Sequence, residues 1–161
     1  MQPHAPEELI TLRSIASRLT PSARQARQRI MAHTLALGRP VQVGESVDLA
    51  SAREIEELLA QKVMVVDAQG NVPFIYPVSA LPTHHQVTLA DGRAFSAMCA
   101  IDALGATFTF GQNALIQSKC STCDAPVSLH LRQGRIDSAA PDDLHVLHMN
   151  LNQLTDWAAS C

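Results

Sequence analysis

The spacing of apolar residues changes near residue 62, and no other feature of the sequence constrains the fold as strongly. Before that point the apolar residues recur at helical intervals, with breaks at Pro21 and at Gly38. After it, short extended runs alternate with turn sequences, which is typical of β-strands. The sequence therefore predicts an α+β protein with a helical amino-terminal region. Its three expected helices cover residues 7–19, 23–37 and 51–61.

Capping residues define the ends of these helices. Ser22 can cap the start of the second helix, and Gly38 can end it. Ser51 stands three residues before Glu54, which is the arrangement of a capping box at the start of the third helix. The side chains expected to face inward from that third helix are Ile55, Leu58 and Leu59.

A hairpin is expected after the third helix, formed by residues 63–66 and 72–78 around a turn at 67–71. Helices followed by a hairpin suggest a winged helix, so residues 1–80 are predicted to form a winged-helix-like domain. DNA binding is the usual function of that shape. The third helix, however, carries three glutamates beside Arg53, and acidic side chains repel phosphates. A structural module or lid is the preferred interpretation, and nucleic acid is disfavoured as a partner.

Residues 81–161 are predicted to form a mixed or antiparallel β domain with short helices. An Asp91-Gly92 turn joins residues 87–89 and 94–98 into a hairpin that delivers Cys99 at its end. A short helix over residues 100–104 is expected to end at Gly105. Further strands are expected over residues 114–118, 127–131 and 144–149, and a final helix over residues 152–160.

Composition narrows the class of protein. Apolar residues make up 47% of the 161 residues and aromatic residues only 4%, so the core must be aliphatic. A formal net charge of −3 gives no electrostatic reason to bind nucleic acid or an anionic membrane. The sequence contains no apolar run long enough for a bilayer and no secretion-signal pattern at its start, so we expect a cytoplasmic protein without a membrane partner. Its four cysteines are then expected to be reduced.

Cys99 and Asp102 are the main candidates for chemistry. A strand that ends at Cys99 and a helix that opens at Ala100 would place Asp102 in the first helical turn, close to the thiol. Because Asp102 has no basic partner nearby, burial should raise its pKa and make it a usable acid. A cysteine taken alone is more often a small buried hydrophobe than a nucleophile. Cys161, however, follows a short amphipathic helix and could fold back toward the same site.

The other thiols and the histidines give weaker signals. Cys120 and Cys123 form half of a zinc knuckle or a redox pair, but no second pair exists. The preferred interpretation is that one of these two thiols is buried packing and that the other has no specific role. The seven histidines are scattered, and neighbours such as His84 and His85 would face opposite sides of a strand. The sequence has no Gly-rich phosphate loop, no GxSxG elbow and no HExxH motif.

These residues resemble the organomercurial (alkylmercury) lyase family. The resemblance is strongest over residues 94–131, in the runs FSAMCAIDALG and KCSTCDAPVSL. Upstream, GRPV followed by a helix and a hairpin resembles the family's winged-helix amino-terminal part. Downstream, LTDWAASC resembles the helix that delivers a second catalytic cysteine. Cys120 matches a family cysteine that is read as structural, Cys123 has no counterpart, and the family's chains continue beyond the position where this sequence ends.

The resemblance implies that the protein cleaves carbon–mercury bonds by protonolysis. Cys99 and Cys161 would be the catalytic thiolates that bind mercury, and Asp102 would mediate the proton that reaches the carbon leaving group. Thiolate is the softest protein ligand and suits this metal. No resident cofactor is implied, and external small thiols or a mercuric reductase would take the Hg(II) product. The apolar neighbours that would suit an alkyl or aryl group are Ala97, Met98, Ala100, Ile101 and Leu104.

Two other functions remain open. The first is a non-catalytic relative that binds soft metals, which would take up metal without releasing hydrocarbon. The second is a winged-helix transcriptional regulator with sensor cysteines, which a salt-dependent DNA mobility shift would reveal.

Overall fold

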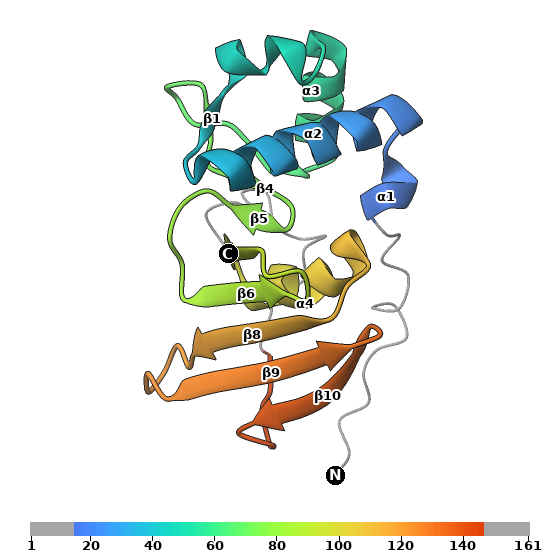
Figure 1. Cartoon of the computed structure of the whole chain (residues 1–161). Coiled ribbons are helices and arrows are strands. Elements are labelled where there is room, and N and C mark those ends of the chain that lie inside the picture. The colour runs from blue at the N-terminus through green and yellow to red at the C-terminus, as the bar shows by residue number, and fades with distance from the viewer. Residues whose placement is uncertain (1–14, 147–161) are drawn as a thin grey trace.

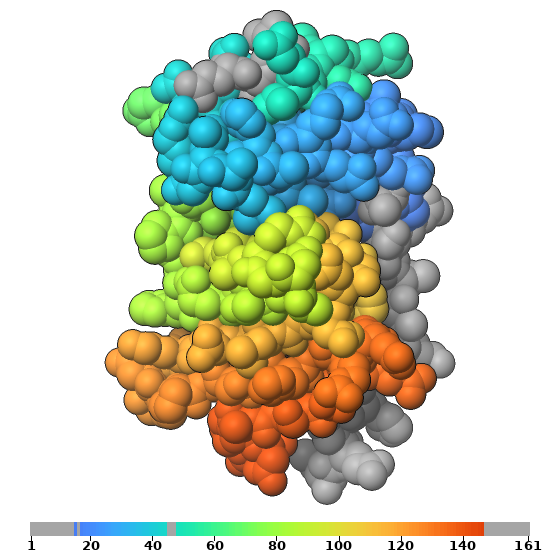
Figure 2. Space-filling model, viewed as in Figure 1, coloured from blue at the N-terminus to red at the C-terminus, as the bar shows by residue number. Residues whose placement is uncertain are grey.

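Three helices occupy one end of the molecule, and strands of an antiparallel sheet extend to the other end (Figure 1). The structure is a computed structural model that describes residues 15–146. Figure 2 shows the helical layer, the middle strands and the last three strands stacked in that order along the molecule. The α+β class is therefore confirmed. The helices are α1 (Ile15–Arg18), α2 (Pro21–Leu37), the 3-10 helix η2 (Val43–Asp48), α3 (Ala52–Ala60) and α4 (Ala100–Phe110).

Eight strands form one sheet in the order β10-β9-β8-β6-β7-β5-β4-β2, and β1 pairs with β3 in a second sheet. Every neighbouring pair is antiparallel. The strands are β1 (Val41–Gln42), β2 (Met64–Val65), β3 (Asn71–Val72), β4 (Phe74–Ile75), β5 (Val78–Ser79), β6 (His85–Leu89), β7 (Ala94–Ala97), β8 (Ala114–Lys119), β9 (Pro126–Arg132) and β10 (Arg135–Ala140).

The ends of α2 and α3 are set by side-chain caps. Thr20, and not Ser22, caps α2, because its hydroxyl accepts a hydrogen bond from the Ala23 N–H and Pro21 occupies the first turn. Gly38 ends α2 as predicted, with a left-handed φ of 64°. The predicted capping box of α3 is confirmed, since the Ser51 N–H donates to Glu54 Oε2 at 2.7 Å and the Glu54 N–H donates to Ser51 Oγ at 3.3 Å.

The run over residues 72–78 is three short strands rather than one. Pro73 separates β3 from β4, and Pro77 precedes β5, because proline cannot donate the hydrogen bond that a continuous ladder needs. The predicted pairing with residues 63–66 is nevertheless present, with Met64 opposite Ile75. Whether this region is a winged helix stays a prediction.

One sheet contains strands from both sides of the predicted boundary at residue 80. The link is made by β5 and β7, where Val78 lies opposite Ala97. The division into residues 1–80 and 81–161 stays a prediction. The site described below draws on residues from both parts.

Helix α4 is longer than predicted. It does not end at Gly105 but continues to Phe110, and Gly111 ends it with a left-handed φ of 62°. Gly105 lies inside the helix. A glycine is needed there because the Tyr76 side chain packs against it, and an added Cβ would overlap with the Tyr76 hydroxyl. Glycine at this position therefore serves packing and does not terminate the helix.

The strands before and after α4 are largely as predicted. Residues 87–89 and 94–98 form the expected hairpin, with Val87 opposite Phe95, and β8 and β9 cover residues 114–118 and 127–131. Strand β10 was not predicted, because most of its side chains are exposed and give no alternating apolar signal. Residues 144–146 are not a strand. The rest of that expected strand, the helix over 152–160 and the start of the first helix lie outside the described residues.

The core is mainly aliphatic and lies between the helices and one face of the sheet. Leu59 was predicted to face inward but is 39% exposed, whereas Leu58 is fully buried. Within residues 15–146, every helix is too short or too polar to span a lipid bilayer. The largest fully buried side chains are Ile30, Val41, Leu58, Val63, Val72, Ile75, Pro77, Val78 and Val87.

Candidate functional site

Cys99 lies where strand β7 leads into helix α4, as the sequence predicts. Its backbone is extended (φ −142°, ψ 176°), and Ala100 is the first residue of the helix. The Cys99 residue is half-buried. The amide groups of a first helical turn favour negative charge, so this position suits a thiolate.

The Asp102 carboxyl lies one helical turn into α4, next to Cys99. Its Oδ2 accepts a hydrogen bond from the Cys99 backbone N–H at 3.2 Å, and the residue is only 7% exposed. Burial raises the pKa of Asp102 to about 6, although hydrogen bonds from the Cys99 side chain and backbone oppose the rise. A carboxyl with this pKa can take up and release a proton near neutral pH. The predicted pairing of this thiol with a buried acid is therefore present in the fold.

The raised pKa of Asp102 makes protein stability depend on pH. The folded protein holds this proton up to about pH 6, whereas the unfolded chain loses it near pH 3.8. The resulting stabilisation is complete below pH 3.8 and is lost as the pH rises through about 6. At pH 8 we expect Asp102→Asn to be more stable than the parent protein by about 3 kcal/mol, since one pKa unit corresponds to about 1.4 kcal/mol.

Urea unfolding of both proteins from pH 4 to pH 8 measures this difference. The gain in the free energy of unfolding should become small at pH 4, where the folded carboxyl is protonated and the unfolded carboxyl is close to its own pKa of 3.8. The same substitution at the exposed Asp142 serves as the matched control and should show no such trend. A constant difference at every pH would contradict the assignment.

Tyr76 forms a wall of this site that the sequence analysis did not single out. Its hydroxyl packs on Gly105, one turn after Asp102 in α4. Burial raises the pKa of Tyr76, and the negative charge of Asp102 raises it further. The hydroxyl therefore keeps its proton and is a neutral group near the carboxyl of Asp102.

Arg27 of α2 holds Tyr76 in place. Its Nε and Nη2 donate to the Tyr76 carbonyl oxygen at 3.0 and 2.7 Å, and Nη2 also donates to Thr109 Oγ1 at 3.3 Å. The guanidinium carbon lies 5.4 Å from the centre of the Tyr76 ring, a cation–π arrangement. Burial lowers the pKa of Arg27 from its very high ordinary value. One buried cation therefore connects α2, the segment before β5 and helix α4.

Two signals in the sequence could have indicated this wall. Tyr76 is the single tyrosine of the chain and stands in a run of apolar residues directly before a proline. Arg27 interrupts the buried face of α2, between Ala26 and Ile30. A charged residue on an apolar helix face is expected to have a specific buried partner.

The second predicted thiolate, Cys161, lies outside the described residues. Its place beside Cys99 stays a prediction, as do the catalytic roles of Cys99, Asp102 and Cys161. The described neighbours of Cys99 are apolar, as expected for a site that accepts a hydrophobic group. Ala97 is buried, and the others are half-buried: Met98, Ala100, Ile101 and Leu104.

Of the thiols and histidines between residues 15 and 146, none but Cys99 joins this site as a metal ligand. Cys120 and Cys123 lie in the turn between β8 and β9. His85 Nδ1 is 2.8 Å from Ser118 Oγ, and its pKa is lowered by burial and then by His84. Within residues 15–146, no three His, Cys, Asp or Glu side chains are grouped so that they could hold a metal ion.

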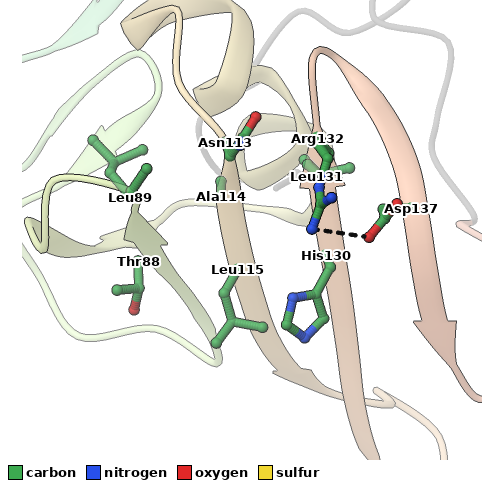
Figure 3. A pocket seen from close by; sticks show the side chains of 10 residues that line it. Thr88, Leu89, Asn113, Ala114, Leu115, His130, Leu131, Arg132 and Asp137 are labelled. Atoms are coloured by element: carbon green, nitrogen blue, oxygen red, sulfur yellow. Dashed lines mark ion pairs between the residues drawn. The ribbon is translucent and has the colours of Figure 1, made fainter.

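A shallow pocket of about 220 Å³ lies on the last strands of the sheet (Figure 3). Thr88, Leu115 and His130 form one row across β6, β8 and β9 in this pocket. Arg132 and Asp137 form an ion pair of 3.7 Å at one side of it. The pocket contains none of the predicted site residues, so it is separate from the Cys99–Asp102 site.

The fold and site define an α+β protein with a cysteine and a buried acid at the start of one helix. Residues 78–161 match the sequence model of the alkylmercury lyase (MerB) family. This match covers just over half of the chain, and the chain therefore belongs to the alkylmercury lyase family.

The crystal structure of the mercury-bound form of MerB2 is similar, with a TM-score of 0.57 and 20% sequence identity. The alignment covers 80% of this chain and 64% of that chain, so this chain spans less than two thirds of the length of MerB2. At this identity the similarity shows a shared fold. The search of curated proteins found no match.

Proposed function

We propose that this protein cleaves the carbon–mercury bond of organomercurials by protonolysis. The observation that carries the proposal is the pairing of Cys99 with the buried Asp102 at the start of α4, in a member of the alkylmercury lyase family. A soft sulfur ligand and an acid with a pKa of about 6 are the two groups that this reaction requires.

In the proposed reaction, the thiolates of Cys99 and Cys161 bind the mercury atom of the substrate and displace its other ligand. Electron donation from two sulfurs weakens the carbon–mercury bond. That bond breaks with its electron pair on carbon, and Asp102 transfers a proton to the carbon. The products are a hydrocarbon and Hg(II) held by two sulfurs, so charge and atoms balance.

Tyr76 supports this reaction as a positioning residue. Its ring and hydroxyl cover α4 at Gly105 and help to keep water from the Asp102 carboxyl. Arg27 fixes the Tyr76 backbone through its two hydrogen bonds to the carbonyl. The apolar side chains around Cys99 suit the alkyl or aryl group of the substrate.

The site needs no resident cofactor for this chemistry. External small thiols would remove Hg(II) by ligand exchange, and a mercuric reductase would be the protein that receives it. We place the reaction in the cytoplasm, where cysteines stay reduced.

Detection of hydrocarbon in the gas phase tests the proposal. Mixing the reduced protein with phenylmercury or methylmercury and excess small thiol should release benzene or methane over many turnovers. The same mixture without protein gives the background rate. Uptake of one equivalent of metal without hydrocarbon would instead show a non-catalytic metal-binding protein.

A further inference from the structure

The turn between β8 and β9 places two thiols on one short loop, at the left edge of the sheet in Figure 1. The Cys120 N–H donates to the Ala125 carbonyl at 2.9 Å, and the Asp124 N–H donates to the Cys120 carbonyl at 3.0 Å. Asp124 has a left-handed φ of 56°, which turns the chain directly after Cys123. These bonds fold the loop so that both cysteines lie on the same turn.

The turn also lowers the pKa of the Cys120 thiol. Hydrogen bonds from the N–H groups of Thr122 and Cys123 lower the pKa of Cys120, and the Cys123 side chain adds a further hydrogen bond. Successive N–H groups in a tight turn form a small anion-binding concavity.

The two thiols are accessible and have few other possible ligands near them. Cys123 is exposed and Cys120 is half-buried. A structural zinc site needs four ligands, and in the described part of the chain no third His, Cys, Asp or Glu joins this pair. The ion that suits two thiolates alone is soft and two-coordinate, as Hg(II) is.

Cys120 also lies at the same edge of the sheet as Cys99. Strand β6 is flanked by β7 and β8, with His85 opposite Ala97 and Gln86 opposite Gln117. Cys99 follows the end of β7, and Cys120 follows the end of β8. Two strand spacings correspond to roughly 10 Å between these strand ends.

We propose that Cys120 and Cys123 form a second thiolate site, which binds one two-coordinate soft metal ion. Hg(II) released at Cys99 would be its natural ligand, and this last assignment rests on the proposed lyase function. The binding itself does not depend on that function. The sequence alone favours a packed and an incidental thiol here, whereas the turn joins the two thiols into one site.

Titration of the full chain with inorganic Hg(II) tests the proposal. In the Cys99→Ser/Cys161→Ser variant, only these two thiols remain, and we expect one equivalent of Hg(II) to stay bound after gel filtration with a competing monothiol. Adding Cys123→Ser should weaken retention by about 100-fold or more, because two linked ligands bind with a high effective concentration. Adding Ser121→Ala, in the same turn, is the matched control and should leave retention unchanged.

The ultraviolet absorption of mercury–thiolate bonds reports binding directly, and far-ultraviolet circular dichroism checks that each variant is folded. If the serine variants do not fold, the parent chain offers the same test, since Cys123→Ser alone should remove one equivalent of bound Hg(II). Unchanged retention after loss of Cys123, or no binding with only these two thiols present, would overturn the proposal. Hydrocarbon release is measured in a separate assay, so failure of the lyase proposal can be distinguished from failure of the proposed second metal site.

Discussion

We expect replacement of Cys99 by serine to abolish hydrocarbon release from an organomercurial, with turnover falling by about 10⁴-fold or more. The hydroxyl of serine is a hard ligand and keeps its proton at neutral pH, so it cannot replace a thiolate on mercury. The backbone N–H of residue 99 can still donate its hydrogen bond to Asp102 in this variant, so α4 can begin as before. We therefore expect the variant to fold like the parent protein and to lose only the reaction.

The measurement is the rate of benzene release from phenylmercury with excess small thiol, followed by gas chromatography. Gln117→Ser on the exposed surface of β8 is the matched control, because it introduces the same residue away from the site. Turnover that stays at the parental rate in Cys99→Ser would refute the role of this thiol.

The second large effect is expected on replacement of Asp102, which should lower hydrocarbon release but leave binding of the organomercurial intact. Asp102→Ala leaves the Cys99 thiol in place, so the protein should still take up the organomercurial. Hydrocarbon release should fall by about 10²- to 10⁴-fold, since that is the range for loss of a general acid. Asp102→Asn should behave like Asp102→Ala in this assay. Its amide oxygen can accept the hydrogen bond from the Cys99 N–H, but the side chain supplies no proton to the carbon.

Parallel assays of mercury uptake and hydrocarbon release check this prediction. Asp142→Asn, on the exposed segment after β10, is the control and should keep both properties. Equal losses of uptake and release at Asp102 would instead point to a structural role for the carboxyl. Full release by either variant would require another proton donor.

Local patterns allowed the centre of the site to be predicted from the sequence. Cys99 and Asp102 are one helical turn apart, and the hairpin before them, the end of α2 at Gly38 and the capping box of α3 are also local features. Their contact follows as soon as α4 begins at Ala100. Apolar surroundings were enough to predict that the pKa of Asp102 rises.

The wall of the site could not be predicted in this way, because it depends on contacts between distant segments. Gly105 was expected to end a helix, since its partner Tyr76 cannot be identified from the local sequence. Arg27 reaches Tyr76 and Thr109 only after the helical layer packs on the sheet. Strand β10 was missed for the opposite reason, because its exposed side chains carry no apolar pattern.

The link from Arg27 through Tyr76 to α4 has a consequence for any shortened form of the protein. A fragment that begins at residue 78 would keep all of the family-matched segment, including Cys99 and Asp102. It would lack both Tyr76 and Arg27, so Gly105 would lose its cover and water would reach the Asp102 carboxyl. The pKa of that acid would then fall toward its ordinary value of 3.8, and the matched segment alone would hold the reactive groups without the surroundings that tune them.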